Sequence, residues 1–166
     1  MSLLISRQPT VLSVDHLIVN GAFLQEIKEA YSHVWDYLNR LLQSGRQGLP
    51  LSIDANQWIV QLVDFRTGLE QVFRMEATYG FVRQAARGPQ HSGLDAAAVL
   101  NQHSELYVRL SELCEQIEEA QYRGTIIRDF PRYGEAFEQF YESLMEHERL
   151  ESALIHRSLG LRPTAF

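Results

Sequence analysis

Two ionisable residues lie within the apolar stripe of one predicted helix. Over residues 137–154, apolar side chains recur at spacings of three and four, which is typical of the buried face of an amphipathic helix. His147 and Glu151 occupy two positions of this stripe, one turn apart. Because burying an unpartnered polar group costs about 2–7 kcal/mol, we expect them to meet partners in the core or to bind a metal. A slightly rotated helix would instead leave both at its rim as a solvated pair.

Two further predicted helices carry a ligand-type residue in their apolar stripes. Glu76 interrupts the stripe of a helix that starts near Asp54 and is closed by Gly88 and Pro89. His103 interrupts the stripe of a helix over about residues 96–122. Other interpretations stay open, because a carboxylate can sit at a helix rim and a lone histidine on an apolar face is often a satisfied core residue.

The stripes also predict the fold. One more amphipathic segment covers residues 22–43, and the helix with His147 follows a connection bracketed by Gly124 and Pro131 and stops before Gly160. No strand pattern competes with these four helices. We therefore predict an all-α, up-down-up-down antiparallel four-helix bundle over residues 22–166, preceded by an irregular N-terminal arm, residues 1–21.

In such a bundle the four stripes converge on one seam. We therefore expect Glu76, His103, His147 and Glu151 to meet there. Two histidines and two carboxylates form a nitrogen and oxygen ligand set that suits iron, manganese or zinc.

The composition and net charge of the chain argue against several classes of function. The chain has 166 residues, of which 45% are hydrophobic, and its net charge of −6 argues against nucleic acid or an anionic membrane surface as a partner. The one cysteine, Cys114, falls in an apolar stripe and is expected to be a buried thiol. The sequence contains no apolar run typical of a signal peptide or a membrane span. These features predict a cytoplasmic protein.

Three motifs resemble the hemerythrin-like, HHE-type cation-binding family. They are M-E-H-E-R-L-E (Met145 to Glu151), L-E-Q-V-F-R-M-E-A-T-Y-G-F (Leu69 to Phe81) and L-N-Q-H-S-E-L (Leu100 to Leu106). The resemblance covers about residues 22–159. It implies iron as the cofactor, His103 and His147 as metal ligands, and Glu76 and Glu151 as metal-bridging carboxylates. It also implies a small diatomic ligand, such as oxygen or nitric oxide.

The chain departs from the family pattern at two ligand positions. Val72 stands where the family has a histidine one turn before the glutamate, and valine cannot bind a metal. The family also takes a histidine from its first helix, but His33 falls away from the apolar face and Val34 is expected to face the core. Neither Asp36 nor Tyr79 is well placed to replace these ligands. The resemblance therefore implies an incomplete, at most single-metal site.

Three functions remain in competition. The first is a protein that binds or senses iron, or another divalent metal, through this degenerate site. The second is a metal-free structural or interaction bundle, in which the histidines neutralise the carboxylates. The third is a di-metal oxidase or peroxidase, for which the ligands are too few. No motif for a catalytic triad or for phosphate binding supports other chemistry, so we assign no catalytic residues.

Overall fold

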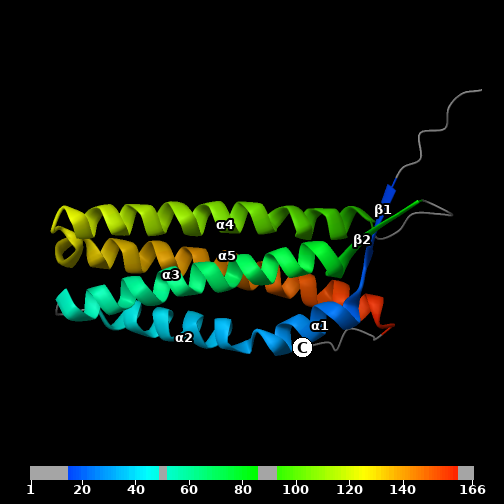
Figure 1. Ribbon diagram of the computed structural model, residues 1–166, viewed down its shortest axis with the longest axis horizontal. Helices are drawn as coiled ribbons and strands as arrows, with labels where there is room; N and C mark the ends of the chain where they lie inside the picture. Colours follow the sequence, from blue (N-terminus) through cyan, green and yellow to red (C-terminus); the bar gives the residue numbers. More distant parts are fainter. Residues whose placement is uncertain (1–14, 49–51, 86–92, 161–166) are drawn as a thin grey trace, which may run out of the picture.

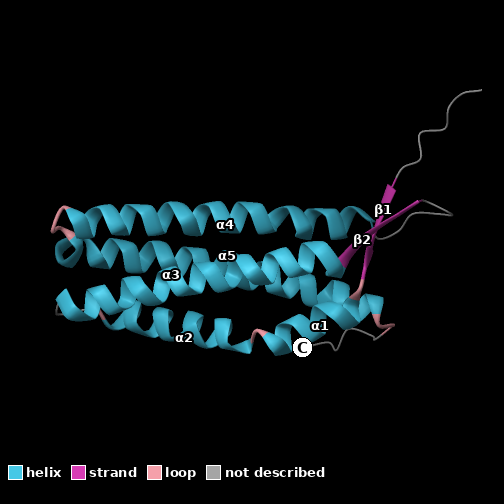
Figure 2. Ribbon diagram, viewed as in Figure 1, coloured by secondary structure: helices cyan, strands magenta, loops and turns pink. Residues whose placement is uncertain are grey.

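The computed structural model describes residues 15–48, 52–85 and 93–160, and helices dominate this part of the chain (Figure 2). The all-α class is therefore confirmed. The elements in chain order are β1 (Asp15–Val19), α1 (Gly21–Ala30), α2 (Ser32–Gln47), α3 (Ser52–Met75), the π-helical turn η1 (Glu76–Gly80), β2 (Phe81–Ala85), α4 (Gly93–Tyr122) and α5 (Ile126–Ser158).

The long helices α2, α3, α4 and α5 lie side by side along the longest axis of the molecule, and α1 continues the line of α2 (Figure 1). Helix α5 contacts α1, α2, α3 and α4, while α3 also contacts α2 and α4. The apolar stripes meet between these helices and form a core that includes Trp58, Phe65 and Phe137. None of the helices in the described ranges is both long enough and apolar enough to cross a membrane.

The first predicted helix is divided in two. Residues 22–43 were expected to form one helix, but α1 and α2 meet at Tyr31, whose φ and ψ angles of −105° and 25° leave the helical range. The sequence contains no proline or glycine at this point, so its pattern gave no signal of a break. The break separates α2 from α1, which packs against η1 and α5.

The prediction that no strands form is wrong at one end of the molecule. Residues 15–19, placed in the irregular arm, form β1, which pairs antiparallel with β2 from Asp15 opposite Ala85 to Val19 opposite Phe81. Strand β1 reads D-H-L-I-V, so apolar residues point to both faces and hide the alternation that would signal a strand. Residues 1–14 lie outside the described part of the chain.

The helix that carries Glu76 also ends earlier than predicted. Helix α3 stops at Met75, and the π-helical turn η1 is closed by the Phe81 N–H, which donates to the Glu76 carbonyl. Gly80 is needed here, because an added Cβ would lie 2.2 Å from Cδ2 of the buried Leu24. The predicted end at Gly88 and Pro89 lies outside the described residues.

Helix α5 begins before the position that the sequence indicated. Its first residue is Ile126, directly after a turn at Gly124 with a φ of +71°. Pro131 lies inside the helix instead of bracketing the connection. Its side chain is exposed, so the helix accommodates the residue without placing it in the core.

Candidate metal centre

Four polar side chains meet in the interior near the strand pair. Glu76, His103, His147 and Glu151 have exposed fractions of 0%, 5%, 1% and 0%, and they are the buried polar or charged residues among those described. One possible ligand atom from each lies within 4.8 Å of the other three. The prediction that these side chains share one depth is confirmed, and the solvated-rim interpretation is excluded.

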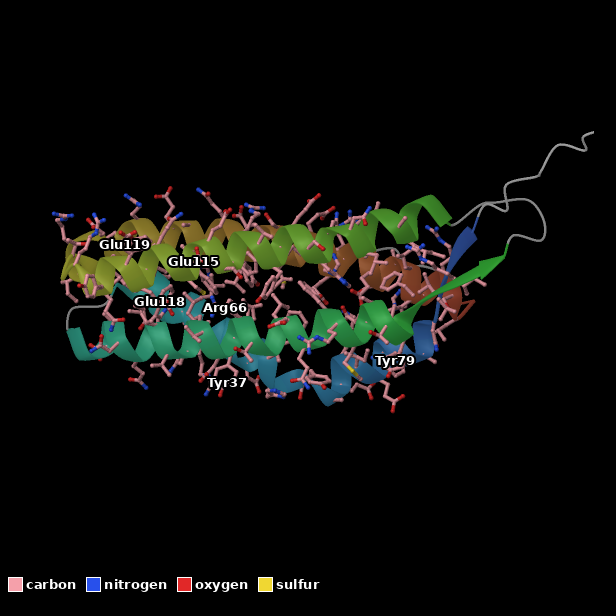
Figure 3. The ribbon with its side chains drawn as sticks, turned by 45° about the horizontal axis from the view of Figure 1, so that its top comes forward. Tyr37, Arg66, Tyr79, Glu115, Glu118 and Glu119 are labelled. Atoms are coloured by element: carbon pink, nitrogen blue, oxygen red, sulfur yellow. The ribbon has the colours of Figure 1, made fainter. Side chains whose placement is uncertain are left out.

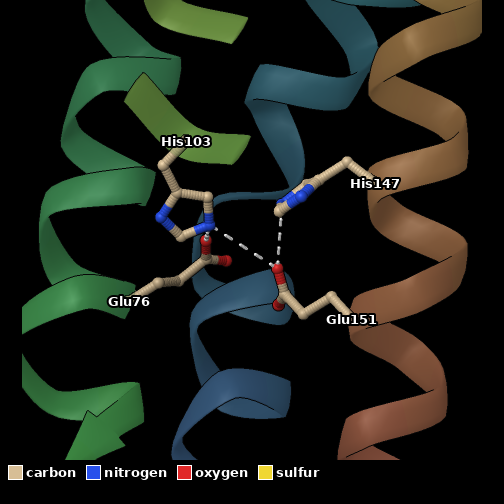
Figure 4. Close-up of side chains that lie close together, drawn as sticks. All are labelled: Glu76, His103, His147 and Glu151. Atoms are coloured by element: carbon tan, nitrogen blue, oxygen red, sulfur yellow. Dashed lines mark ion pairs between the residues drawn. The ribbon is translucent and has the colours of Figure 1, made fainter. Parts of the chain in front are cut away.

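Three elements supply the cluster (Figure 4). Glu76 comes from η1, His103 from α4, and His147 and Glu151 from successive turns of α5. Pi-helical turns often occur at functional sites because they reorient one side chain relative to a regular helix. Here Glu76 is the first residue of such a turn, and its carboxylate lies against the α4 histidine.

The polar atoms approach one another without forming hydrogen bonds. Nε2 of His147 is 3.2 Å from Oε2 of Glu151, and Nε2 of His103 is 3.4 Å from Oε2 of Glu76. None of these atoms has a hydrogen-bond partner in the described structure, and the second oxygens of both carboxylates also lack one. Buried polar groups normally have partners. Donor atoms that converge without satisfying one another are the arrangement that a bound cation would complete.

The two imidazole rings are held by their surroundings. Nδ1 of His147 lies 2.9 Å from Oε1 of Gln102, so an Nδ1–H can donate to the amide oxygen while Nε2 faces Glu151. Such a hydrogen bond is the usual way in which a metal-binding histidine is oriented. The ring of His103 stacks on Phe73 with a centroid distance of 4.2 Å and an interplanar angle of 7°.

Burial sets the protonation of the cluster. Burial, followed by the charge of Glu151, raises the pKa of Glu76 to about 9, so Glu76 is protonated near neutral pH. Burial, followed by His147, lowers the pKa of His103 to about 3, so this imidazole is neutral. Burial also acts to raise the pKa of Glu151, but contact with His147 and the charge of Lys28 hold it below its ordinary value. A metal ion would therefore displace the Glu76 proton.

The sequence reasoning missed Lys28 and Glu148. The Lys28 ammonium pairs with the Glu148 carboxylate and lies 3.4 Å from Oε1 of Glu151. Both side chains are mostly buried, with exposed fractions of 17% and 18%. A signal existed, because Lys28 lies one turn after Leu24 and one turn before Tyr31 on the edge of the apolar face. A charged residue at such an edge is usually solvated, so the pattern alone does not place Lys28 in the core.

The structure places His33, Val34 and Val72 on the sides of their helices that the pattern predicts. His33 is exposed and its ring contacts Tyr31, whereas Val34 and Val72 are each 1% exposed. The cluster of possible ligands in the described chain includes no residue of α2 or of α3. Tyr79 is 53% exposed and does not join it.

A surface pocket of about 420 Å³ lies beside the cluster, between α3 and α4. Its lining includes Phe73, Leu100, His103 and Tyr107. His103 therefore belongs to both the pocket and the cluster, although its ring nitrogens are buried.

Comparisons with known proteins find no family model, no curated protein and no solved structure that matches this chain. The resemblance of the three helix motifs to the hemerythrin-like family therefore stays a prediction.

Proposed function

We propose that this protein is a hemerythrin-like, up-down-up-down four-helix bundle that binds a single divalent metal, most naturally non-haem iron. Glu76, His103, His147 and Glu151 would hold the ion. The observation that carries the proposal is the convergence of two imidazole nitrogens and two carboxylates, all buried and without hydrogen-bond partners. The lengthwise packing of α2, α3, α4 and α5 supports the bundle.

The ligand atoms of the four side chains suit a divalent metal ion both in their chemical elements and in their total charge. His103 would bind as a neutral imidazole, and the Gln102 hydrogen bond leaves Nε2 of His147 free to do the same. Two carboxylates balance the charge of one divalent cation once Glu76 has lost its proton. Nitrogen and oxygen donors favour iron, manganese or zinc over calcium or copper(I). The bound metal would supply an open coordination position for a small diatomic ligand, and the pocket beside His103 lies next to the cluster.

One observation favours a second function. Nζ of Lys28 lies 3.4 Å from Oε1 of Glu151, so part of the carboxylate charge is already neutralised by the protein itself. If Lys28 and the histidines satisfy the carboxylates completely, the chain is a metal-free bundle with a structural or interaction role. This alternative predicts that no metal binds.

The experiment is elemental analysis of protein purified without chelator, joined to thermal melts with Fe(II) or Zn(II). We expect at most one metal per chain and a higher melting temperature with metal, because the ion binds only the folded state. His147→Ala should abolish the shift. The control is His33→Ala, which removes an exposed histidine and should retain it.

Two results would contradict the proposal. Protein without bound metal and without a thermal shift would favour the metal-free bundle. Two tightly bound metals per chain would show that an additional ligand has been overlooked.

A further inference from the structure

We propose that Lys28, which pairs with Glu148, is a fixed positive charge beside the metal centre and competes with a divalent metal for the carboxylate of Glu151. This inference rests on the proposed function, since it concerns the same cluster. It assigns a specificity-determining role to a residue that is not itself a metal ligand. Lys28 would weaken the binding of a divalent ion at the cluster and oppose the entry of a second ion.

The position of Lys28 carries the proposal. Its ammonium pairs with Glu148, and it lies 3.4 Å from Oε1 of Glu151, whose Oε2 lies 3.2 Å from Nε2 of His147. Glu151 therefore stands between the ammonium on one side and the histidine on the other. An ion bound beside His147 would share this carboxylate with Lys28.

The packing of α1 holds Lys28 at this place. Gly80 lets Leu24 of α1 approach η1 closely, and Nζ of Lys28 lies 6.0 Å from the ring centroid of Trp35, a cation–π contact. With only 17% of its side chain exposed, Lys28 is screened little by water, so its charge acts strongly on its neighbours.

The charges balance for one divalent ion. Ionised Glu76 and Glu151 would neutralise one such ion, and Glu148 would neutralise Lys28. A second divalent ion on the same carboxylates would meet the ammonium and leave an excess of positive charge in the interior, which is costly. Removing the lysine charge should therefore strengthen metal binding, whereas removing the charge of Glu148 should weaken it.

The test measures Zn(II) affinity of metal-free protein by competition with a chromophoric chelator. Lys28→Met removes the ammonium and should bind Zn(II) at least about tenfold more tightly than the wild type, because a nearby unit charge in a poorly screened site contributes at least that factor. A purely structural role for Lys28 would not produce tighter binding. The control is Arg46→Met, which breaks an exposed ion pair with Glu138 and should leave the affinity unchanged.

A second pair of variants covers the case in which Lys28→Met does not fold. Glu148→Gln should bind Zn(II) more weakly than the wild type. The double variant Lys28→Met, Glu148→Gln removes both buried charges together, which proteins usually tolerate. The double variant should bind at least about tenfold more tightly than Glu148→Gln alone. Equal affinities in these two variants would overturn the inference.

The outcomes separate this inference from the proposed function. If the wild type binds Zn(II) and Lys28→Met binds it no more tightly, the inference is wrong and the proposed function stands. If only Lys28→Met binds Zn(II), the ammonium has replaced the metal, so the inference holds and the proposed function fails. If neither protein binds Zn(II), both are wrong.

Discussion

The two ends of the interior differ in the residues that fill them: aromatic rings pack at one end, and ionisable side chains meet at the other. Away from the strands, Trp58 packs edge-on against Phe130 and Phe137, and its Nε1–H donates to the Leu41 carbonyl at 3.1 Å. Near the strands, the cluster of Glu76, His103, His147 and Glu151 keeps several buried atoms without hydrogen-bond partners. Figure 3 shows Tyr79 at this polar end and Glu118 and Glu119 of α4 near the other.

The difference separates an end that stabilises the fold from an end whose unpaired polar groups cost stability, and the proposed metal site lies at the second end. The aromatic end gains free energy from the burial of apolar surface, whereas every unpaired atom of the polar cluster opposes folding. Proteins usually retain a destabilising buried polar group only where that group has a functional role. Mutations at the two ends should therefore change stability in opposite directions.

The largest effect is expected at the aromatic end. Phe137→Ala should lower the free energy of unfolding by about 3–5 kcal/mol, because it leaves a cavity among close-packed rings. Urea denaturation of metal-free protein measures it. Val108→Ala at an exposed position should change stability by less than about 0.5 kcal/mol. A loss below about 1 kcal/mol for Phe137→Ala would remove the contrast between the two ends.

A smaller change of opposite sign is expected at the polar end. Glu76→Met replaces a buried, unpartnered carboxyl group by an apolar side chain of similar length. We expect metal-free Glu76→Met to be about 1–3 kcal/mol more stable than the wild type, because the cost of the unmet polar group is removed. The same variant should lose the thermal shift with Zn(II). The matched substitution Glu105→Met, at an exposed position, should change neither property.

The same carboxyl group predicts a pH dependence of the metal-free protein. Because burial raises the pKa of Glu76 to about 9, its ionisation disfavours the folded state, so stability is greatest below the ordinary glutamate pKa and falls as the pH rises through about 9. His103 acts in the other direction: its pKa is lowered to about 3, so its contribution is full above about 6.5 and is lost as the pH falls. Stability should therefore decline between pH 7 and pH 9, and Glu76→Met should remove most of that decline. An unchanged decline in the variant would contradict the role of Glu76.

Sequence periodicity was sufficient for the presence of the long helices and for the four buried polar residues, but not for the break at Tyr31 or for the helix ends. Side chains at spacings of three and four must share a face, so Glu76 and His103 could be placed in the core before their neighbours were known. Periodicity also predicted that Val34 faces the core and that His33 faces solvent, and in the structure Val34 is buried and His33 is exposed. These inferences depend only on the geometry of a regular helix.

The remaining features depend on contacts between distant segments. The π-helical turn at Glu76 and the strand pair form where α1 approaches Gly80. The sequence pattern of either segment alone does not predict this contact. Lys28 reaches the cluster from α1, which is separate from α2 and packs against α5. The apolar stripe of a single helix carries no information about its neighbours, so it does not reveal that a flanking lysine meets Glu148 and Glu151.

The most direct test of the metal centre is a crystal structure of Zn(II)-soaked protein with anomalous diffraction at the zinc edge. We expect a single strong anomalous peak among Glu76, His103, His147 and Glu151, at about 2.0–2.2 Å from the ligand atoms of both histidines and at least one carboxylate. The absence of a peak at this cluster, or a peak on surface residues alone, would contradict the account.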